Sequence, residues 1–177
     1  MHESVMEFGR QVILPGEVIG KDILEVGSMN VNGTLGSVVQ PYKPNKYVGT
    51  DMRAGTGVDV VVPAEQLVLH FGYESFDMVI CTEMLEHCKP WKDAVQNIVG
   101  VCKTNGVIIL TARGPGAGYH SYPEDFWRFT LEDIYKVFCH NQIEALKSDL
   151  EYPGFLAKIR KISPKVFTSF EVLAVTC

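Results

Sequence analysis

The sequence lacks the features that mark several other classes of protein. No apolar run approaches the length of a membrane span, and the first residues, MHESVMEFGRQVIL, carry acids and no apolar core of the kind a secretory signal has. We therefore expect a cytoplasmic protein without a membrane partner. The five cysteines include no C-x-x-C pair, which favours free thiols over disulfides or a zinc site, so no metal is predicted. The formal net charge of −5 argues against a nucleic-acid partner.

Length and composition are those of an ordinary globular domain. The chain has 177 residues, of which 46% are hydrophobic and 21% charged. We expect a single domain over residues 1–177 that begins with a helical segment at 1–20, and a monomer or a homodimer.

Apolar runs that end in turn residues alternate with longer amphipathic segments. Strands are expected at 22–27, 46–51, 58–62, 76–81 and 106–112. The last two are apolar on both faces, as in parallel sheets that helices cover on both sides. Helices are expected in PAEQLVLHF, in PWKDAVQNIVGVCK, and in TLEDIYKVF, where Thr130 is the expected N-cap.

Beyond residue 140, QIEALKSDLE and GFLAKIRKI suggest an antiparallel pair at the edge of the sheet, and FTSFEVLAVTC is strand-like without an assigned role. The order of elements predicts an α/β fold. It is a Rossmann-like doubly wound sheet, mostly parallel with an antiparallel edge strand, and it has helices on both faces.

The stretch DILEVGSMNVNG has the strand and glycine turn of a nucleotide site but not the dinucleotide fingerprint. Met29 stands where the second glycine of G-x-G-x-x-G would be. Asp51 ends the second strand 24 residues after Gly27 (51 − 27), close to the spacing at which an acid binds ribose hydroxyls. The structural alternatives are a surface turn or a helix cap for Asp51, and an ordinary tight turn for Gly27.

Four motifs between residues 20 and 135 carry a family resemblance: LEVGS with NG after it, YVGTDMRAGTGVDVV, FDMVICTEMLEH and YPEDFWRFT. In order and spacing they resemble the class I S-adenosylmethionine-dependent methyltransferases, in particular the small type 11 and type 23-like members. The resemblance accounts for the missing glycine, because S-adenosylmethionine has no phosphates for the turn to hold. It implies S-adenosylmethionine as the cofactor and S-adenosylhomocysteine as its product.

The resemblance also implies a set of residues around the cofactor. They would line the cofactor from its methionyl end, through the ribose, to the adenine. The residues are Glu25, Gly27, Ser28, Asn30, Gly33, Asp51, Met52, Asp59, Val60, Cys81 and Thr82. Asp51 would bind the ribose hydroxyls. Because GSMNVNG departs from the commoner turn, the path of residues 28–33 stays open.

Catalytic candidates are His120, Glu83 and His87, and acceptor-binding candidates are Tyr122, Asp125, Trp127 and Arg128. Most of them belong to residues 113–129, whose three glycines and two prolines suggest a lid or acceptor loop. The alternatives are an exposed loop histidine for His120, a capping or packing role for His87, and aromatic anchoring of the loop with Arg128 paired to an acid.

These observations predict in-line transfer of a methyl group from S-adenosylmethionine to oxygen of a small-molecule or sugar-like acceptor. No Pro-Pro-aromatic turn of the amino-methyltransferases follows the fourth strand. One alternative is a non-catalytic module that binds S-adenosylmethionine or S-adenosylhomocysteine. Another is an NAD-dependent Rossmann oxidoreductase, which Met29 disfavours because its side chain would crowd a pyrophosphate.

Overall fold

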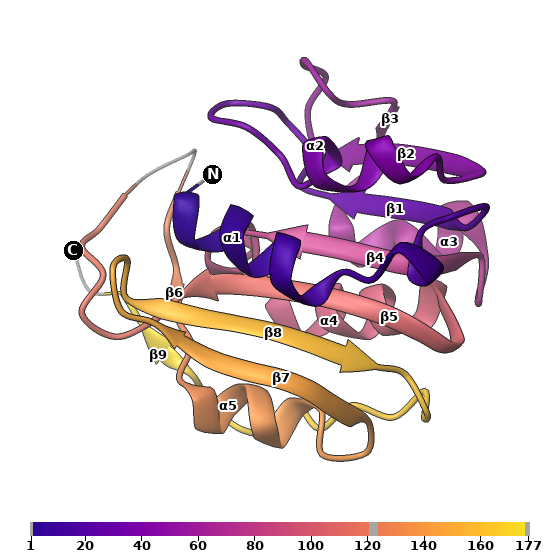
Figure 1. The fold of residues 1–177 in the computed structure, drawn as a ribbon. Coiled ribbons are helices and arrows are strands. Elements are labelled where there is room, and N and C mark those ends of the chain that lie inside the picture. The colour runs from indigo at the N-terminus through magenta and orange to yellow at the C-terminus, as the bar shows by residue number, and fades with distance from the viewer. Residues whose placement is uncertain (1, 121–123, 176–177) are drawn as a thin grey trace.

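A seven-stranded sheet forms the centre of the computed structural model, which describes residues 2–120 and 124–175 (Figure 1). Its strands follow the order β3-β2-β1-β4-β5-β8-β7. Their bounds are β1 Asp22–Val26, β2 Lys46–Asp51, β3 Val60–Val61, β4 Phe76–Thr82, β5 Cys102–Arg113, β7 Gln142–Asp149 and β8 Gly154–Arg160. A separate pair joins β6 Trp127–Arg128 to β9 Leu173–Ala174.

Strand directions confirm the predicted fold class. The neighbours from β3 to β5 are parallel, and β8 runs antiparallel to both β5 and β7. The hairpin of β7 and β8 thus completes one edge of the sheet, as predicted. The carboxyl ends of β1, β2, β4 and β5 all lie on one side, the left in Figure 1. Ligands of open α/β sheets bind at this end.

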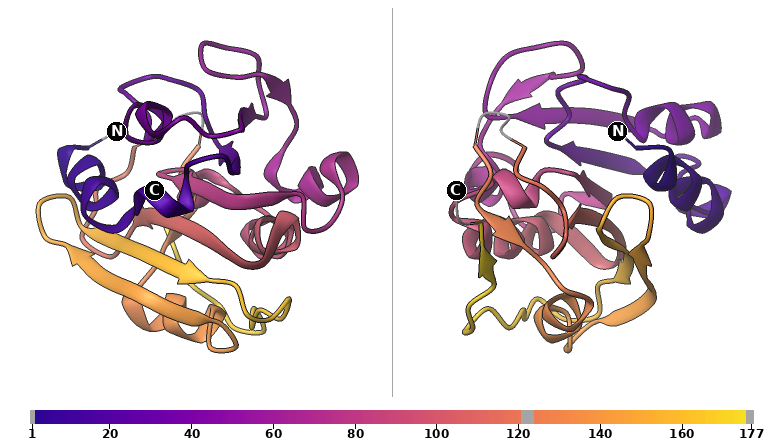
Figure 2. Two further views of the ribbon diagram at one scale, coloured as in Figure 1. Left: turned by 45° about the vertical axis from the view of Figure 1, so that its right-hand side comes forward. Right: turned by 90° about the vertical axis from the view of Figure 1, so that its left-hand side faces the viewer.

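Helices cover both faces of the sheet (Figure 2). On one face, α1 Glu3–Val12, η1 Pro15–Glu17, α2 Gly36–Val39 and η2 Gln40–Tyr42 surround one core cluster. On the other face, a larger cluster packs against η3 Ala64–Gln66, α3 Leu67–Phe71, η4 Leu85–His87, α4 Trp91–Val101 and α5 Leu131–Val137. No helix within the described ranges is long and apolar enough to cross a membrane.

The sequence pattern explains the two best-defined helices. In α4 the residues at three- and four-residue spacing are buried: Trp91, Ala94, Val95, Ile98 and Val99. This is the apolar stripe that an amphipathic helix turns to a core. In α5, Thr130 and Asp133 form the predicted capping box, with both reciprocal hydrogen bonds present.

Some boundaries differ from expectation. The helix α4 was expected to reach Lys103 but ends at Val101, because Cys102 already pairs with Phe76 in the sheet. For the same reason β5 begins at Cys102, before the expected residue 106. The pairing register between β4 and β5 then shifts at an irregularity in which Asn105 has φ 64°. β3 has two residues instead of the expected five. In the strand-like C-terminal stretch only Leu173–Ala174 form a strand, and residues 176–177 lie outside the described ranges.

Candidate active site

A pocket of about 670 Å³ lies at the carboxyl ends of β1, β2 and β4. Of the predicted site residues, the following line it: Glu25, Gly27, Gly33, Asp51, Met52, Thr82, Glu83, His87 and His120. They come from four separate stretches of the chain. The sheet therefore brings all three predicted catalytic residues and six of the eleven predicted cofactor residues to one concave surface.

The turn after β1 depends on a glycine. Gly27 has φ +74°, and a Cβ there would lie 2.7 Å from Cγ of Met84. Met29, in place of the expected second glycine, packs against Gly55, where an added Cβ would be 3.1 Å from the Met29 Cε. The backbone amide of Asn30 donates to the Thr56 carbonyl at 2.8 Å. The turn at 28–30 therefore rests on the turn at 55–57, and the glycines that permit close approach lie in this second turn.

Glu25 lies at the end of β1 with only 3% of its surface exposed. The Tyr47 hydroxyl donates to its Oε2 at 2.6 Å, and Thr34 contributes a further hydrogen bond. Burial outweighs these bonds and raises the pKa of Glu25 to about 7. The pocket thus contains a carboxyl group whose charge is sensitive to pH and to a cationic ligand.

The end of β2 supplies Asp51 and Met52 to the pocket wall. Asp51 accepts a hydrogen bond from the Arg53 amide at 3.0 Å and remains partly exposed. The opposite side of this part of the pocket is formed by Val62 and the residues after it: Pro63, Ala64 and Glu65. Asp59 and Val60, which the sequence placed at the adenine, do not line the pocket. The Asp59 carboxylate instead accepts from the Gly49 amide at 2.8 Å.

Other predicted cofactor residues face away from the pocket as well. Ser28 is buried and donates from its hydroxyl to the Gly57 carbonyl at 2.8 Å. Asn30 does not line the pocket, but its side chain accepts from the Gly33 amide and so shapes the turn, the role expected of it. Cys81 has no exposed surface, and burial raises the pKa of its thiol. The prediction that Ser28 and Cys81 lie beside a ligand is therefore not supported by the geometry.

Glu83 is held at the floor of the pocket. Its Oε1 accepts from the Thr111 hydroxyl at 2.8 Å, and its carboxylate forms an ion pair with Arg113. The residue has φ 54°, a left-handed conformation that is rare for a non-glycine residue and often found at functional sites. The contacts with Arg113 and Thr111 therefore hold the Glu83 carboxylate in one position.

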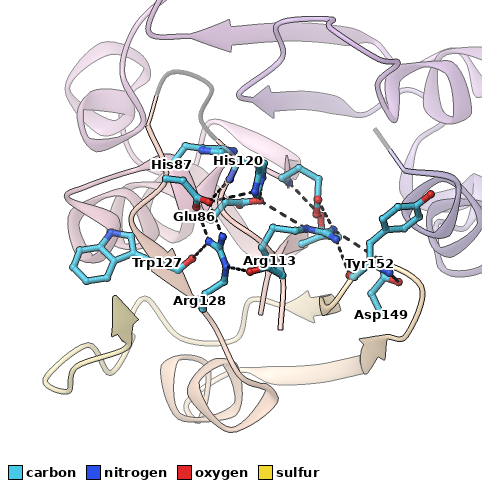
Figure 3. Close-up of polar contacts among 12 residues, drawn as sticks. Glu86, His87, Arg113, His120, Trp127, Arg128, Asp149 and Tyr152 are labelled. Atoms are coloured by element: carbon cyan, nitrogen blue, oxygen red, sulfur yellow. Dashed lines mark hydrogen bonds and ion pairs between the residues drawn. The ribbon is translucent and has the colours of Figure 1, made fainter. Parts of the chain in front are cut away.

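Next to Glu83 lies a cluster of titratable groups that Figure 3 shows in close-up. Glu86 has no exposed surface, and burial together with the charge of Glu83 raises its pKa to about 8. The rings of His87 and His120 meet edge to face with centroids 4.9 Å apart. Nδ1 of His87 lies 2.6 Å from the Glu124 carbonyl, and burial lowers the pKa of this imidazole. Sequence reasoning missed Glu86, since a buried acid in a short helical turn has no periodic signal.

Asp125 and Arg128 form the support of His120. The guanidinium of Arg128 donates to both carboxylate oxygens of Asp125, at 2.5 and 2.6 Å, and to the Gly118 carbonyl. Burial raises the pKa of Asp125, but the hydrogen bonds from Arg128 and from the His120 amide outweigh it and hold the pKa below its ordinary value. This arrangement fixes the backbone at His120.

The predicted acceptor residues do not form a pocket wall. Asp125 and Arg128 are buried in their mutual pair, and Trp127 donates from its indole to the Cys88 carbonyl at 3.0 Å. These contacts correspond to the structural alternative considered from the sequence, in which an aromatic residue anchors the loop and Arg128 pairs with an acid. Tyr122 lies outside the described residues. In the 113–129 segment the pocket is lined by His120, Glu124 and Phe126.

Comparison with known proteins agrees with this geometry. Residues 40–110 match the model of the type 11 methyltransferase domain family. A solved 1,6-didemethyltoxoflavin-N1-methyltransferase from Burkholderia thailandensis, with its substrate and S-adenosylhomocysteine bound, superposes with a TM-score of 0.71 at 13% identity and covers 91% of this chain and 80% of that one. An S-adenosylmethionine-dependent methyltransferase from Mesorhizobium loti gives 0.68 at 14%, with 89% and 98% covered. No curated protein matches the chain.

At these identities the solved structures show the fold, and the family match runs from η2 into β5, a part of the chain that supplies Asp51, Thr82 and the turn at 55–57. The fold is therefore shared with solved S-adenosylmethionine-dependent methyltransferases, and residues 40–110 match a methyltransferase domain family. The resemblance drawn from the four sequence motifs is thereby confirmed.

Proposed function

We propose that the protein transfers a methyl group from S-adenosylmethionine to oxygen of a small-molecule acceptor. The observation that carries the proposal is the continuity of one pocket, with Asp51 at its β2 end and the imidazoles of His87 and His120 at the other. A pocket of about 670 Å³ is within the range that small-ligand sites occupy. The formal net charge of −5 also favours a small acceptor over a nucleic acid.

The residues of the β1 and β2 ends fit the cofactor. Gly27 lines the pocket and has no side chain to keep a ligand from its backbone. An added Cβ there would also collide with Met84. Asp51 is the acid for the ribose hydroxyls, and Met52 with Val62 and Ala64 would enclose the adenine. Glu25 is placed to meet the methionyl ammonium, which would favour its ionised form. Ser28, Cys81, Asp59 and Val60 are left out of this proposed set.

The histidine end fits the acceptor. When bound, S-adenosylmethionine supplies an electrophilic methyl group, so the protein must align the acceptor and remove its proton where it has one. Glu83 is occupied by Arg113 and Thr111. The imidazoles of His87 and His120 remain, and Phe126 supplies an apolar wall. An oxygen acceptor needs such a group because a neutral hydroxyl is a poor nucleophile.

A nitrogen acceptor is the second candidate. The Burkholderia thailandensis neighbour is named as an N1-methyltransferase of a small heterocycle. Against nitrogen in this chain stands the turn after β4, Cys81-Thr82-Glu83-Met84, which has no Pro-Pro-aromatic sequence. The acceptor screen below includes both classes.

Calorimetry with S-adenosylhomocysteine tests the cofactor half. We expect Asp51→Asn to weaken binding by roughly 10- to 100-fold, because a charged hydrogen-bond partner of the ribose is lost. The variant Glu132→Gln is the control, since Glu132 is exposed on α5 and does not line the pocket. Unchanged affinity in Asp51→Asn, or binding of NADH in place of S-adenosylhomocysteine, would contradict the assignment.

An acceptor screen tests the catalytic half. Formation of S-adenosylhomocysteine is followed with sugars, phenols, hydroxy acids and nitrogen heterocycles. Turnover with a hydroxylic acceptor supports the proposal, and turnover only with a heterocycle moves it to nitrogen. Cofactor binding without turnover on any acceptor favours the non-catalytic binding module.

A further inference from the structure

Three side chains beside the pocket could share a metal ion. Glu86 and His87 lie on η4, and His120 lies in the segment after β5. One ligand atom from each lies within 4.8 Å of the other two. Both histidines line the pocket, whereas Glu86 lies behind them without exposed surface. Sequence reasoning predicted no metal because it considered only the cysteines.

The carboxylate of Glu86 has no satisfying partner. Neither of its oxygens has a hydrogen bond to any residue of the described chain. Nε of Arg113 is 3.9 Å from Oε1, but the Arg113 guanidinium is turned to Glu83 and to the Tyr152 carbonyl, which accepts from Nη1 at 2.6 Å. A buried carboxylate in this condition needs either a proton or a cation.

A cation can take the place of the proton. Both carboxylate oxygens of Glu86 are buried and without a hydrogen-bond partner among the described residues, so either is open to a metal ion. The ring atom closest to this carboxylate, Nε2 of His120, is 3.8 Å from Oε1, beyond a hydrogen bond. A metal ion bonded to both atoms at about 2.0–2.2 Å would hold them about 3.4 Å apart in a tetrahedral site, which is close to the observed 3.8 Å.

Both imidazoles are oriented as metal ligands are. Nδ1 of His87 is 2.6 Å from the Glu124 carbonyl, so this nitrogen carries the proton and Nε2 keeps its lone pair. Nδ1 of His120 is 3.3 Å from both the Gly118 carbonyl and Oδ2 of Asp125. A histidine that binds a metal usually donates its other ring N–H to a carbonyl or carboxylate in this way.

The charge around the cluster also suits a dication. The guanidinium groups of Arg113 and Arg128 lie among four carboxylates, those of Glu83, Glu86, Asp125 and Asp149. With Glu86 ionised, as a metal ligand must be, two of the carboxylate charges are not balanced by the arginines.

We propose that Glu86, His87 and His120 bind one divalent transition-metal ion, such as Zn²⁺, through one carboxylate oxygen and the two Nε2 atoms. Two nitrogens and one oxygen are a donor set of catalytic zinc sites, which keep an open position. Here the open position faces the pocket, because the carboxylate approaches from the buried side.

The inference adds to the proposed function, and the site itself does not depend on that function. With a metal bound, the Nε2 lone pairs are ligands and are not available as bases. An acceptor hydroxyl in the open position would instead lose its proton more easily because coordination lowers its pKa. The metal would thus replace the histidines as the group that activates the acceptor.

The experiment is a titration of tag-free, metal-stripped protein with Zn²⁺ by calorimetry and with Co²⁺ by visible absorption. We expect one ion per chain. Glu86→Gln, His87→Ala and His120→Ala should each weaken binding at least about tenfold. His70→Ala and His140→Ala are matched controls, since both histidines are exposed and lie outside the cluster; they should bind as the wild type does.

Absence of stoichiometric binding by the wild type would overturn the proposal, and so would binding that all three cluster variants retain. Circular dichroism and thermal melting of each variant show whether it is folded. Because Glu86→Gln removes a buried charge and keeps its shape, it stays a fair test if a histidine variant unfolds. Titration with S-adenosylhomocysteine on the same samples separates the two proposals. Binding of S-adenosylhomocysteine without binding of the metal refutes the metal site alone, and binding of the metal without S-adenosylhomocysteine refutes the cofactor assignment alone.

Discussion

The buried carboxyl of Glu25 makes the stability of the fold depend on pH in a direction opposite to that of most acids. Burial raises its pKa to about 7 from the ordinary 4.5. Between these two values the folded chain binds a proton that the unfolded chain has released. Stability therefore falls as the pH rises through this window, and it is flat below about pH 4.5 and above about pH 7 for this group.

The magnitude follows from the shift. At 1.36 kcal/mol for each unit, the full contribution is about 3 kcal/mol, of which about 2.5 kcal/mol is lost between pH 5 and pH 8. Glu25→Gln removes the titration and keeps an acceptor for the Tyr47 hydroxyl. We therefore expect the free energy of unfolding of this variant minus that of the wild type to increase by about 2.5 kcal/mol from pH 5 to pH 8, because only the wild type loses this stability.

Urea unfolding at four pH values, followed by tryptophan fluorescence and circular dichroism, gives this difference directly. Other titrating groups are common to both proteins and cancel. Glu151→Gln, which removes an exposed carboxylate, controls for the loss of one negative charge. Parallel pH profiles of wild type and Glu25→Gln would refute the reasoning.

The same group links pH to ligand binding. Since the proposed function brings the methionyl ammonium to Glu25, affinity for S-adenosylhomocysteine should rise between pH 6 and pH 8 in the wild type. In Glu25→Gln it should be weaker and show less dependence on pH. An equal dependence in both proteins would separate Glu25 from the ligand.

Two substitutions test the frame of the pocket by urea unfolding. Gly27→Ala forces a side chain into a left-handed turn at φ +74° and should cost at least about 1–2 kcal/mol, whereas Gly16→Ala, where an added Cβ has nothing within 4 Å, should change stability by less than about 0.5 kcal/mol. Equal effects would show that the turn is not constrained. Arg128→Lys keeps the charge but loses the two-pronged bond to Asp125, and we expect a loss of roughly 1–3 kcal/mol against about 0.5 kcal/mol or less for the exposed Arg10→Lys. A loss as small as that of the control would show that the buried pair does not hold this segment.

The arrangement of the pocket shows where sequence reasoning reached its limit. Positions with a backbone requirement lie at the pocket: Gly27 has a positive φ, and Asp51 lies at a strand end. Positions chosen by adjacency in the chain lie away from it. Ser28 follows Gly27 but turns into the contact with Gly57, and Cys81 precedes Thr82 but points to the core. Alternate residues of a strand face opposite sides, so only one neighbour of each pair can reach a ligand.

The sequence by itself determined the class of fold and the edge at which the pocket forms. Strand and helix periods, the capping box at Thr130 and the glycine turn after β1 are local signals, set by residues close together in the chain. Tertiary structure alone decided the contacts between distant segments. It placed Met29 on Gly55 and brought Glu86 to His120, 34 positions later in the sequence (120 − 86). No pattern in the chain encodes such pairs, because they arise only when the parallel strands bring their carboxyl ends to one side.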